Sequence, residues 1–281
     1  MDQKQSSLSG KVAVITGGYG VLCQAMARAL AEQGVKIAIL GRNLEKAQAF
    51  ASELRTMGTL AIGIKADVLN KEELELANVE INTKLGICDF LINGAGGNHP
   101  DRITTKSMME EEDLGNNSLK TFFDLDVAGF KYIFDLNMLG TLLPTQVFAK
   151  EMIGRTDCSI VNISSVAAIK PLTKVASYGS AKAAISNFTE WLAVHFSQMG
   201  IRVNAIAPGF FLADQNSALL TNPDGSLTSR GEQIIQNTPM GRFGKPEDLN
   251  STLLWLLDPK SAFVTGIIVP VDGGFTAYSG V

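Results

Sequence analysis

Tyr178 and Lys182 are the two residues of this chain whose types and spacing best suit proton transfer. They stand four positions apart in Ser177 to Ala184, a run of small residues that predicts a helix, so they share one helix face. A free tyrosine, with a pKa of about 10, is a weak acid–base catalyst at neutral pH. A nearby ammonium stabilises the phenolate, so we expect Lys182 to move the pKa of Tyr178 toward the working range. The pair alone would also fit a surface Lys beside a core Tyr.

A glycine-rich turn near the start of the chain could hold a phosphate. Residues 16–23 have the sequence TGGYGVLC and lead from a predicted strand into a predicted helix, Leu22 to Gln33, that ends at Gly34. Backbone amides in such a turn, together with the positive end of the helix, can face a pyrophosphate. The glycines alone would also suit a tight turn without a ligand. Their place at the start of a βαβ unit favours a dinucleotide site.

The end of the second predicted strand bears on which dinucleotide binds. NAD sites usually place an Asp or Glu there to bond the ribose 2′-hydroxyl, but this chain has Gly41 followed by Arg42. A guanidinium with no carboxylate beside it suits a 2′-phosphate, so the sequence favours NADP(H). Arg42 could instead be a solvated charge at the start of a helix, and NAD(H) therefore stays possible.

Short, nearly continuous apolar runs alternate with longer helical patterns along the chain. Such runs suit strands covered on both faces, which means a parallel sheet with helices above and below. We therefore predict an α/β fold: a single doubly wound Rossmann domain over residues 1–281, with loop insertions at about 97–128 and 210–246 that follow strand ends, where such folds bind ligands. The seven predicted strands are Val12 to Thr16, Lys36 to Leu40, Ala61 to Asp67, Asp89 to Asn93, Ser159 to Ser164, Ile201 to Ala207 and Ile267 to Val271.

Composition argues against several other classes of protein. The 281 residues are 46% apolar and 19% charged, with a formal net charge of -4 and no Lys/Arg cluster with interleaved aromatics, so we expect no nucleic-acid partner. No apolar run could span a bilayer and the start lacks a signal peptide, so we expect a soluble cytoplasmic protein with no membrane partner. The three separated cysteines, Cys23, Cys88 and Cys158, fit reduced buried thiols and predict no metal site.

Several motifs stand around the Tyr and Lys pair in a fixed order. Besides that pair and the glycine-rich turn, they are Asn93 to Gly96 (NGAG), Asn137 to Gly140 (NMLG), Asn162 to Ser165 (NISS) and Pro208 with Gly209. With these motifs the chain resembles the short-chain dehydrogenase/reductase family over nearly its whole length. The resemblance implies an NAD(P)-dependent oxidoreductase that acts on CH–OH groups.

The same resemblance implies four catalytic residues: Asn137, Ser165, Tyr178 and Lys182. Tyr178 would donate the proton, and Ser165, thirteen residues before it, would bind the substrate oxygen in preference to its neighbour Ser164. Lys182 would keep Tyr178 acidic, and Asn137 would hold a water that relays protons from the lysine.

The resemblance also implies a cofactor site assembled from loops at the strand ends. Asp67 and Val68 resemble the adenine contact, although Asp67 could simply cap a strand. Asn93 resembles part of the wall beside the ribose, with a turn former as the alternative, and Pro208 with Gly209 resembles the turn against the nicotinamide. The predicted cofactor residues are Gly17, Tyr19, Gly20, Val21, Leu22, Arg42, Asn43, Asp67, Val68, Asn93, Ala95, Gly96, Tyr178, Lys182, Pro208 and Gly209.

The chain departs from the family pattern in its phosphate loop. Val21 and Cys23 stand where the family has its second and third glycines, and Gly94 replaces the second Asn of NNAG. We expect Gly20 to supply the close backbone approach and Cys23 to be small enough for a helix start packed on a strand.

The stretches INGAGGNHP, TFFDLD and PVDGGFTAYSGV make the chain resemble, within the family, the D-mannonate oxidoreductase (fructuronate reductase) branch, which implies conversion between D-fructuronate and D-mannonate. A gluconate 5-dehydrogenase or a non-catalytic nucleotide-binding homologue are the alternatives. A sugar-acid substrate needs cationic or donor groups for its carboxylate, and His99 is the first candidate, ahead of Lys170, Lys174 and Arg230. Relatives suggest a homo-oligomer, a tetramer built on the helices around Asn137 and Tyr178 and on the last strand.

Overall fold

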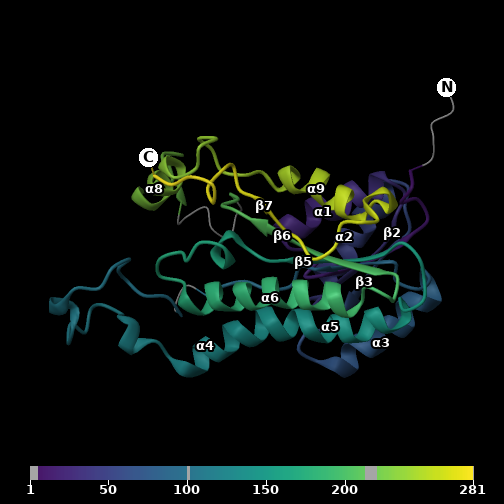
Figure 1. Cartoon of the computed structure of the whole chain (residues 1–281), viewed down its shortest axis with the longest axis horizontal. Coiled ribbons are helices and arrows are strands. Elements are labelled where there is room, and N and C mark those ends of the chain that lie inside the picture. The colour runs from purple at the N-terminus through teal and green to yellow at the C-terminus, as the bar shows by residue number, and fades with distance from the viewer. Residues whose placement is uncertain (1–5, 100–101, 213–219, 281) are drawn as a thin grey trace.

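The computed structural model describes residues 6–99, 102–212 and 220–280, and a parallel sheet forms its centre (Figure 1). Its strand order is β3-β2-β1-β4-β5-β6-β7, and every neighbouring pair is parallel. The predicted seven-stranded doubly wound fold is therefore confirmed. The strands are β1 Val12–Thr16, β2 Lys36–Gly41, β3 Ala61–Lys65, β4 Phe90–Asn93, β5 Cys158–Ile163, β6 Ile201–Pro208 and β7 Ile268–Val271.

Helices cover both faces of the sheet, as the apolar runs require (Figure 1). One core cluster contains Met26, Phe50 and Leu253, from the helices of one face, and a second cluster contains Phe148 and Leu192, from the helices of the other. Each helix thus buries an apolar stripe against strands that are themselves buried on both sides. The first face carries α1 Val21–Glu32, α2 Leu44–Thr56 and α9 Asn250–Leu257; the second carries α3 Lys71–Lys84, α5 Gly140–Phe148 and α6 Ala176–His195.

The order of β1 and β4 creates the crevice in which such folds bind ligands. The chain leaves β1 for β2 on one side and returns to β4 on the other, so the loops after β1 and β4 diverge at the same edge. Thr16 ends β1 in register with Asn93 at the end of β4. The Thr16 hydroxyl accepts hydrogen bonds from the amides of Gly94 and Ala95, at 3.2 Å each, and so fixes the two loops together.

Two long segments extend from this edge of the sheet. The first, between β4 and α4 Val127–Phe134, projects beyond the ends of α4 and α6 at the left of Figure 1 and includes the short 3-10 turns Glu111–Asp113 and Phe122–Asp124. The second follows β6 and contains α8 Ser229–Gln236; residues 213–219 of it lie outside the described ranges. Both segments stand beside the carboxyl ends of the strands.

A buried polar chain crosses the sheet below the catalytic candidates. The Asn93 amide donates to Thr145 Oγ1 at 3.0 Å and to Asn162 Oδ1 at 2.9 Å, and Asn162 donates to Thr189 Oγ1 on α6 at 2.9 Å. The Thr145 hydroxyl in turn donates to the backbone of Thr141 on α5. Because every link is buried, the chain fixes β4, β5, α5 and α6 at one mutual spacing.

Candidate active site

Tyr178 and Ser165 meet at the carboxyl edge of the sheet. Tyr178 lies in the first turn of α6, and Ser165 lies two residues beyond β5 and caps a short 3-10 turn. The Ser165 hydroxyl lies close enough to that of Tyr178 to lower the pKa of the tyrosine, and Ser165 is 6% exposed. Ser164 instead faces α6, where its hydroxyl bonds Ser186 Oγ at 2.8 Å and the carbonyl of Lys182 at 3.2 Å. Of the two serines, Ser165 is therefore the one on the Tyr178 side of the strand end.

Lys182 lies one helical turn after Tyr178 and is almost fully buried. Its ammonium donates to the carbonyl of Ile163 at 2.7 Å and stands 5.6 Å from the centre of the Tyr178 ring. Burial disfavours the charged form and lowers the pKa of Lys182 from its ordinary 10.5 to about 8. A lysine poised near neutrality can exchange protons in the working range of pH.

The pKa of Tyr178 shifts in the direction opposite to the one expected from its sequence neighbour. Burial raises this pKa, and the hydrogen bond to Ser165 offsets the rise only in part. The expectation that Lys182 would lower the pKa of Tyr178 was wrong, because the loss of water around the phenolate on burial is the largest effect on this pKa. The protonated form of Tyr178, the form needed to donate a proton, is accordingly favoured.

Asn137 is held rigidly beside the lysine by an irregular helix. It lies in the π-helical turn Asp135–Leu139 between α4 and α5 and is fully buried. Its amide donates to the carbonyls of Gly97 and Ile133 at 2.8 Å each, while its Oδ1 accepts from the Gly97 amide at 3.1 Å. A side chain on Gly96 would meet Asn137 Oδ1 at 2.6 Å and Lys182 Nζ at 3.4 Å, so the two polar atoms flank the same point. Inserted turns of this kind are often found at functional sites.

The turn after β1 has the form of a phosphate cradle. Helix α1 starts at Val21 with Gly20 as its N-cap, without a side-chain cap and without an acidic residue in its first turn. In contrast, α2 and α3 are capped by the side chains of Asn43 and Asn70. Gly17 has a φ of +61°, and a side chain there would lie 2.9 Å from the Ala95 backbone. The free amides at the positive end of α1 therefore fit the pyrophosphate of a dinucleotide.

Two departures from the family pattern are related in space. Cys23, in the first turn of α1, points at Gly94, where an added Cβ would lie only 2.2 Å from the cysteine Sγ. The thiol thus occupies the volume that a side chain at position 94 would need. Burial raises the pKa of Cys23 to about 12, so the thiol stays protonated and acts as packing. The helix start expected from the small size of Cys23 is confirmed.

Tyr19 covers the end of β2, where nucleotide selection is decided. A side chain on Gly41 would collide with the Tyr19 ring at 2.3 Å, and the Tyr19 hydroxyl accepts from the amide of Asn43 at 3.0 Å. Arg42 is exposed, and no hydrogen bond or ion pair ties it to another residue within the described ranges. The ring, rather than a carboxylate, fills the space beside the predicted adenosine ribose.

The other predicted cofactor residues lie at the ends of the strands, but the side chains of Asp67 and Asn93 are engaged within the protein. Strand β3 ends at Lys65 and is therefore shorter than predicted, so Asp67 lies two residues beyond it. The Asp67 Oδ1 accepts from the Leu69 amide at 3.0 Å, as in a turn. Val68 packs against Gly140. The Asn93 side chain points inward to Thr145 and Asn162, so any contact from Asn93 to a ribose would come from its backbone. The remaining positions, Leu22, Ala95, Gly96, Pro208 and Gly209, all lie in or beside the loops of this edge.

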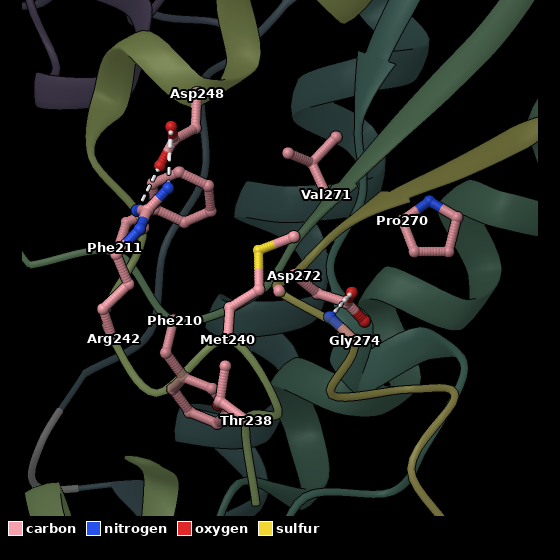
Figure 2. Close-up of a pocket in the computed structure, with 12 residues that line it drawn as sticks. Phe210, Phe211, Thr238, Met240, Arg242, Asp248, Pro270, Val271, Asp272 and Gly274 are labelled. Carbon is pink, nitrogen blue, oxygen red and sulfur yellow. Dashed lines mark hydrogen bonds and ion pairs between the residues drawn. The ribbon is translucent and has the colours of Figure 1, made fainter.

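A separate cavity of about 370 Å³ is lined by Phe210 and Phe211, which directly follow Pro208 and Gly209 in the chain (Figure 2). Arg242 and Asp248 form an ion pair at 2.6 Å on one side of it, and Asp272 lies on the other. None of the four predicted catalytic residues is among its described lining residues. The cavity therefore flanks the predicted nicotinamide position and is not itself the reacting centre.

The predicted carboxylate partners come from separate segments of the chain. His99 is exposed in the loop after β4, and its carbonyl accepts from the Arg102 amide at 3.0 Å. The Lys170 ammonium donates to the carbonyls of Phe275 and Tyr278, at 3.3 and 2.5 Å, and thereby ties the last residues to their own subunit. Lys170 is therefore engaged in structure. Lys174 precedes α6, and Arg230 lies in α8.

A family model described as short chain dehydrogenase matches residues 11–224. The chain is a short-chain dehydrogenase. The resemblance drawn from its motifs is thus confirmed, and so is its class as an oxidoreductase of CH–OH groups that uses NAD or NADP.

Relatives of this dehydrogenase match it over almost its full length. The oxidoreductase UxuB of Bacillus subtilis, itself uncharacterised, is 56% identical over 98% of both chains. A crystal structure from Haemophilus influenza, with bound NAD, belongs to a protein provisionally named D-mannonate oxidoreductase; it is 50% identical over 98% of each chain, with a TM-score of 0.94. A gluconate 5-dehydrogenase from Burkholderia cenocepacia in complex with NADP and tartrate is 29% identical, covers 96% of this chain and 97% of its own, and has a TM-score of 0.83.

One positioning residue escaped prediction from the sequence. Thr16 fixes the loop after β4 through its hydroxyl, and its sequence signals were its place at the end of the first strand and at the start of the glycine-rich turn. The described helices include none that is long and apolar enough to cross a membrane. Within the described residues no cluster of His, Cys, Asp or Glu could hold a metal ion.

Proposed function

We propose that this dehydrogenase interconverts a keto group and a hydroxyl group of a sugar acid, with D-fructuronate and D-mannonate as the substrate pair. The observation that carries the proposal is the single cluster of Ser165, Tyr178, Lys182 and Asn137 at the carboxyl edge of the sheet. The sugar acid follows from the motifs of the chain and from its relative that is provisionally named D-mannonate oxidoreductase.

Each residue of the cluster has a definite part in the reaction. Tyr178 is held protonated by its buried position and donates its proton to the keto oxygen as the substrate is reduced. Ser165, whose hydroxyl lies beside that of Tyr178, binds the same oxygen and orients it. Lys182, with a pKa of about 8, returns a proton toward Tyr178 through a water that Asn137 Oδ1 holds beside Gly96. When bound, the nicotinamide supplies the hydride in reduction and accepts it in oxidation.

Two residues, Arg42 and Tyr19, affect the preference between NADP(H) and NAD(H) in opposite directions. Arg42 offers a guanidinium to a 2′-phosphate, which is the reason for the expectation of NADP(H). Tyr19 fills the space at Gly41 and already occupies the Asn43 amide, so a bulky phosphate would have to displace its ring. We propose that this steric effect is the stronger one and that NAD(H) is preferred.

Replacing Tyr19 with Ala should raise the ratio of kcat/KM for NADPH to that for NADH, and an unchanged ratio would contradict the role of Tyr19.

The absorbance change of NADH and NADPH on addition of D-fructuronate tests the proposed reaction directly. We expect oxidation of the cofactor with D-fructuronate and its reduction with D-mannonate. The same assay with 5-ketogluconate tests the alternative of a gluconate 5-dehydrogenase, which the related structure from Burkholderia cenocepacia favours. Higher kcat/KM for 5-ketogluconate would replace the proposed substrate, and cofactor binding without turnover of any sugar acid would favour the non-catalytic alternative.

The remaining proposals concern the whole chain. We propose that residues 1–281 form one domain, supported by a single sheet whose strands run from Val12 to Val271. We propose a homo-oligomer, a tetramer by resemblance, supported by exposed apolar side chains such as Phe122 and Phe123. A cytoplasmic location is supported by the three cysteines, all free and buried.

A further inference from the structure

The first insertion and the start of α6 enclose a small recess that the proposed mechanism does not use. It is lined by residues of the insertion, of α4 and of α6, and it offers about 20 Å³, room for one water molecule or one carboxylate oxygen. Ser177, which lines it, directly precedes Tyr178. The lining residues are Arg102, Lys120, Leu125, Asp126, Phe130 and Ser177.

Two buried polar atoms in the recess lack partners. Arg102 Nη1 and Ser177 Oγ are both buried, and neither has a hydrogen-bond partner among residues 6–99, 102–212 and 220–280. Ser177 is only 3% exposed. Buried donors of native proteins are almost always satisfied, so two unsatisfied ones in the same recess indicate a ligand that completes them.

The Arg102 side chain is fixed in place against α4. Its guanidinium carbon lies 4.8 Å from the centre of the Tyr132 ring, a cation–π contact. A side chain on Gly129 would lie 3.1 Å from Arg102 Cδ, so the glycine allows the arginine to lie close along the helix. Arg102 therefore presents its guanidinium to the recess without having to reorder when a ligand binds.

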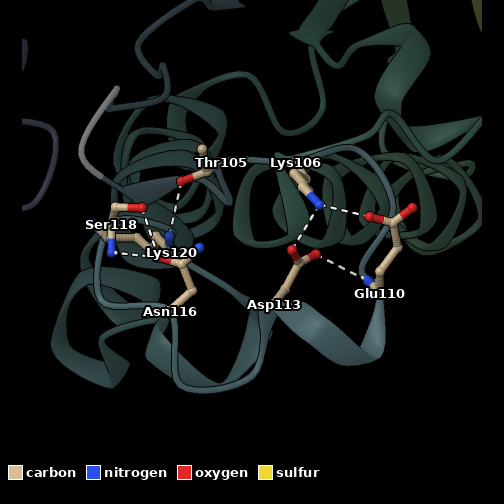
Figure 3. A network of polar contacts seen from close by, with 7 residues as sticks. All are labelled: Thr105, Lys106, Glu110, Asp113, Asn116, Ser118 and Lys120. Carbon is tan, nitrogen blue, oxygen red and sulfur yellow. Dashed lines mark hydrogen bonds and ion pairs between the residues drawn. The ribbon is translucent and has the colours of Figure 1, made fainter.

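The insertion that carries Arg102 is held together by its own polar contacts (Figure 3). Thr105 and Lys120 exchange two hydrogen bonds of 2.9 Å, one between their backbones and one from the Lys120 amide to Thr105 Oγ1. The Lys106 ammonium bonds Asp113 at 2.7 Å. The Thr104 amide donates to the carbonyl of Lys174 at 3.2 Å and so ties the insertion to the segment that precedes α6.

The charges around the recess suit an anion. Arg102 and Lys120 are cationic, and Asp126 is the opposing charge. The two carboxylate oxygens of Asp126 accept the amides of Ala128 and Gly129 at the start of α4, at 3.2 and 2.7 Å. The carboxylate is thus satisfied by the helix that it caps, while the two unpartnered donors remain for a ligand.

We propose that Arg102 and Ser177 bind the carboxylate of the sugar-acid substrate. The inference rests on the proposed function and names the group that selects an acid over a neutral sugar. Ser177 lines the recess and directly precedes Tyr178 in the first turn of α6, so a six-carbon acid whose keto oxygen lies at Tyr178 extends its carboxylate toward the recess. This assignment replaces His99 by Arg102, three residues further along the same loop.

The decisive comparison is between D-fructuronate and D-fructose, which carries CH₂OH in place of the carboxylate. In Arg102→Gln we expect kcat/KM for D-fructuronate to fall about 10- to 100-fold, mainly through KM, because a charge-assisted hydrogen bond is lost. Turnover of D-fructose should not change. Lys131→Gln removes an exposed positive charge from α4 and serves as the matched control.

Ser177→Ala separates binding from structure. We expect KM for D-fructuronate to rise several-fold, while the Tm stays equal or increases because an unpartnered buried hydroxyl has been removed. Ser180→Ala, at an exposed position of α6, is the matched control. A lower Tm with unchanged KM would overturn the proposal.

Other outcomes distinguish this inference from the proposed function. If the unchanged enzyme reduces a different sugar acid, the substrate pair is wrong, and the comparison of that acid with its neutral sugar decides the role of Arg102. An equal loss of turnover for acid and neutral sugar, or no loss for either, would overturn the role of Arg102. Thermal shift adds a readout without turnover: D-mannonate, but not D-mannitol, should raise the Tm of the unchanged enzyme more than that of Arg102→Gln.

Discussion

At the scale of single residues, Tyr178 and Lys182 are each shifted by burial, in opposite directions. Burial raises the pKa of the tyrosine because its charged form is the anion, and it lowers the pKa of the lysine because its charged form is the cation. Together the two shifts favour a protonated Tyr178 beside a Lys182 that loses its proton more easily than a free lysine. That arrangement suits donation of a proton from Tyr178 and its replacement through Lys182.

Removing the hydroxyl of Tyr178 should remove the proton donor and leave the fold. In Tyr178→Phe we expect kcat to fall by about 10²- to 10⁴-fold, the usual contribution of general acid–base catalysis. NADH binding, followed by fluorescence titration, should survive. Tyr278→Phe, which removes a hydroxyl from another tyrosine, is the control. Near-normal turnover in Tyr178→Phe would contradict the assignment of Tyr178 as the proton donor.

Burial of Lys182 should also appear in the pH dependence of stability. Below pH 8 the lysine is charged in both the folded and the unfolded chain, and the cost of burying the charge is fully present. Between about 8 and 10.5 the folded chain has lost this proton while the unfolded chain keeps it, so the free energy of unfolding contains a term that rises with pH.

Urea unfolding of the unchanged protein and of Lys182→Met, at a series of pH values, isolates this term. The difference in unfolding free energy between the two proteins should change in favour of the unchanged protein above pH 8, by at most about 1.4 kcal/mol per pH unit. Parallel pH curves for the two proteins would show that the folded pKa of Lys182 is not lowered.

At the scale of elements, the start of α1 and the loop after β4 have to fit each other. Cys23 enters the volume beside Gly94, and Thr16 bonds the amide of Gly94 from below. In the family pattern, with a glycine at position 23 and an Asn at position 94, the side chain at position 94 would fill the volume that the Cys23 thiol fills here. We interpret the two departures as one change in packing, because each would leave a clash or a gap without the other.

A double-mutant cycle on Cys23 and Gly94 tests that interpretation. Gly94→Ala should destabilise the chain by about 1 to 3 kcal/mol through overpacking against the thiol. In the Cys23→Ala background the penalty should be smaller, with a coupling of roughly 0.5 kcal/mol or more. Some penalty should remain, since the carbonyl of Thr16 also lies 2.9 Å from the added Cβ. Strictly additive unfolding free energies would contradict the coupling.

At the scale of the whole molecule, the insertion after β4 leaves large apolar side chains in contact with water. Met108, Phe122, Phe123 and Val127 are each 67% exposed or more, although polar contacts hold the segment itself together. The last residues, in contrast, turn back on their own subunit, because Phe275 packs edge-on against Phe210 and Lys170 binds the Phe275 carbonyl. The insertion is therefore a stronger candidate for contact between subunits than the chain end.

Light scattering after size exclusion tests the proposed homo-oligomer. We expect a mass that is a multiple of the chain mass, and we expect the combined change Phe122→Ser and Phe123→Ser to shift the protein toward smaller species, because it removes apolar area from the contact. Leu76→Ser, at an exposed position of α3, is the control. A monomeric unchanged protein would contradict the proposal.

The sequence by itself determined the sheet, the helix start after the glycine-rich turn and the Tyr178 and Lys182 pair, because each depends on residues close together in the chain. Only the tertiary structure decided features that join distant segments. The upward pKa shift of Tyr178 depends on how deeply its neighbours bury it, and the collision of Tyr19 with position 41 depends on how β1 lies beside β2. The meeting of Arg102 with Ser177 likewise depends on how the insertion folds against α6, a packing geometry that no local pattern encodes.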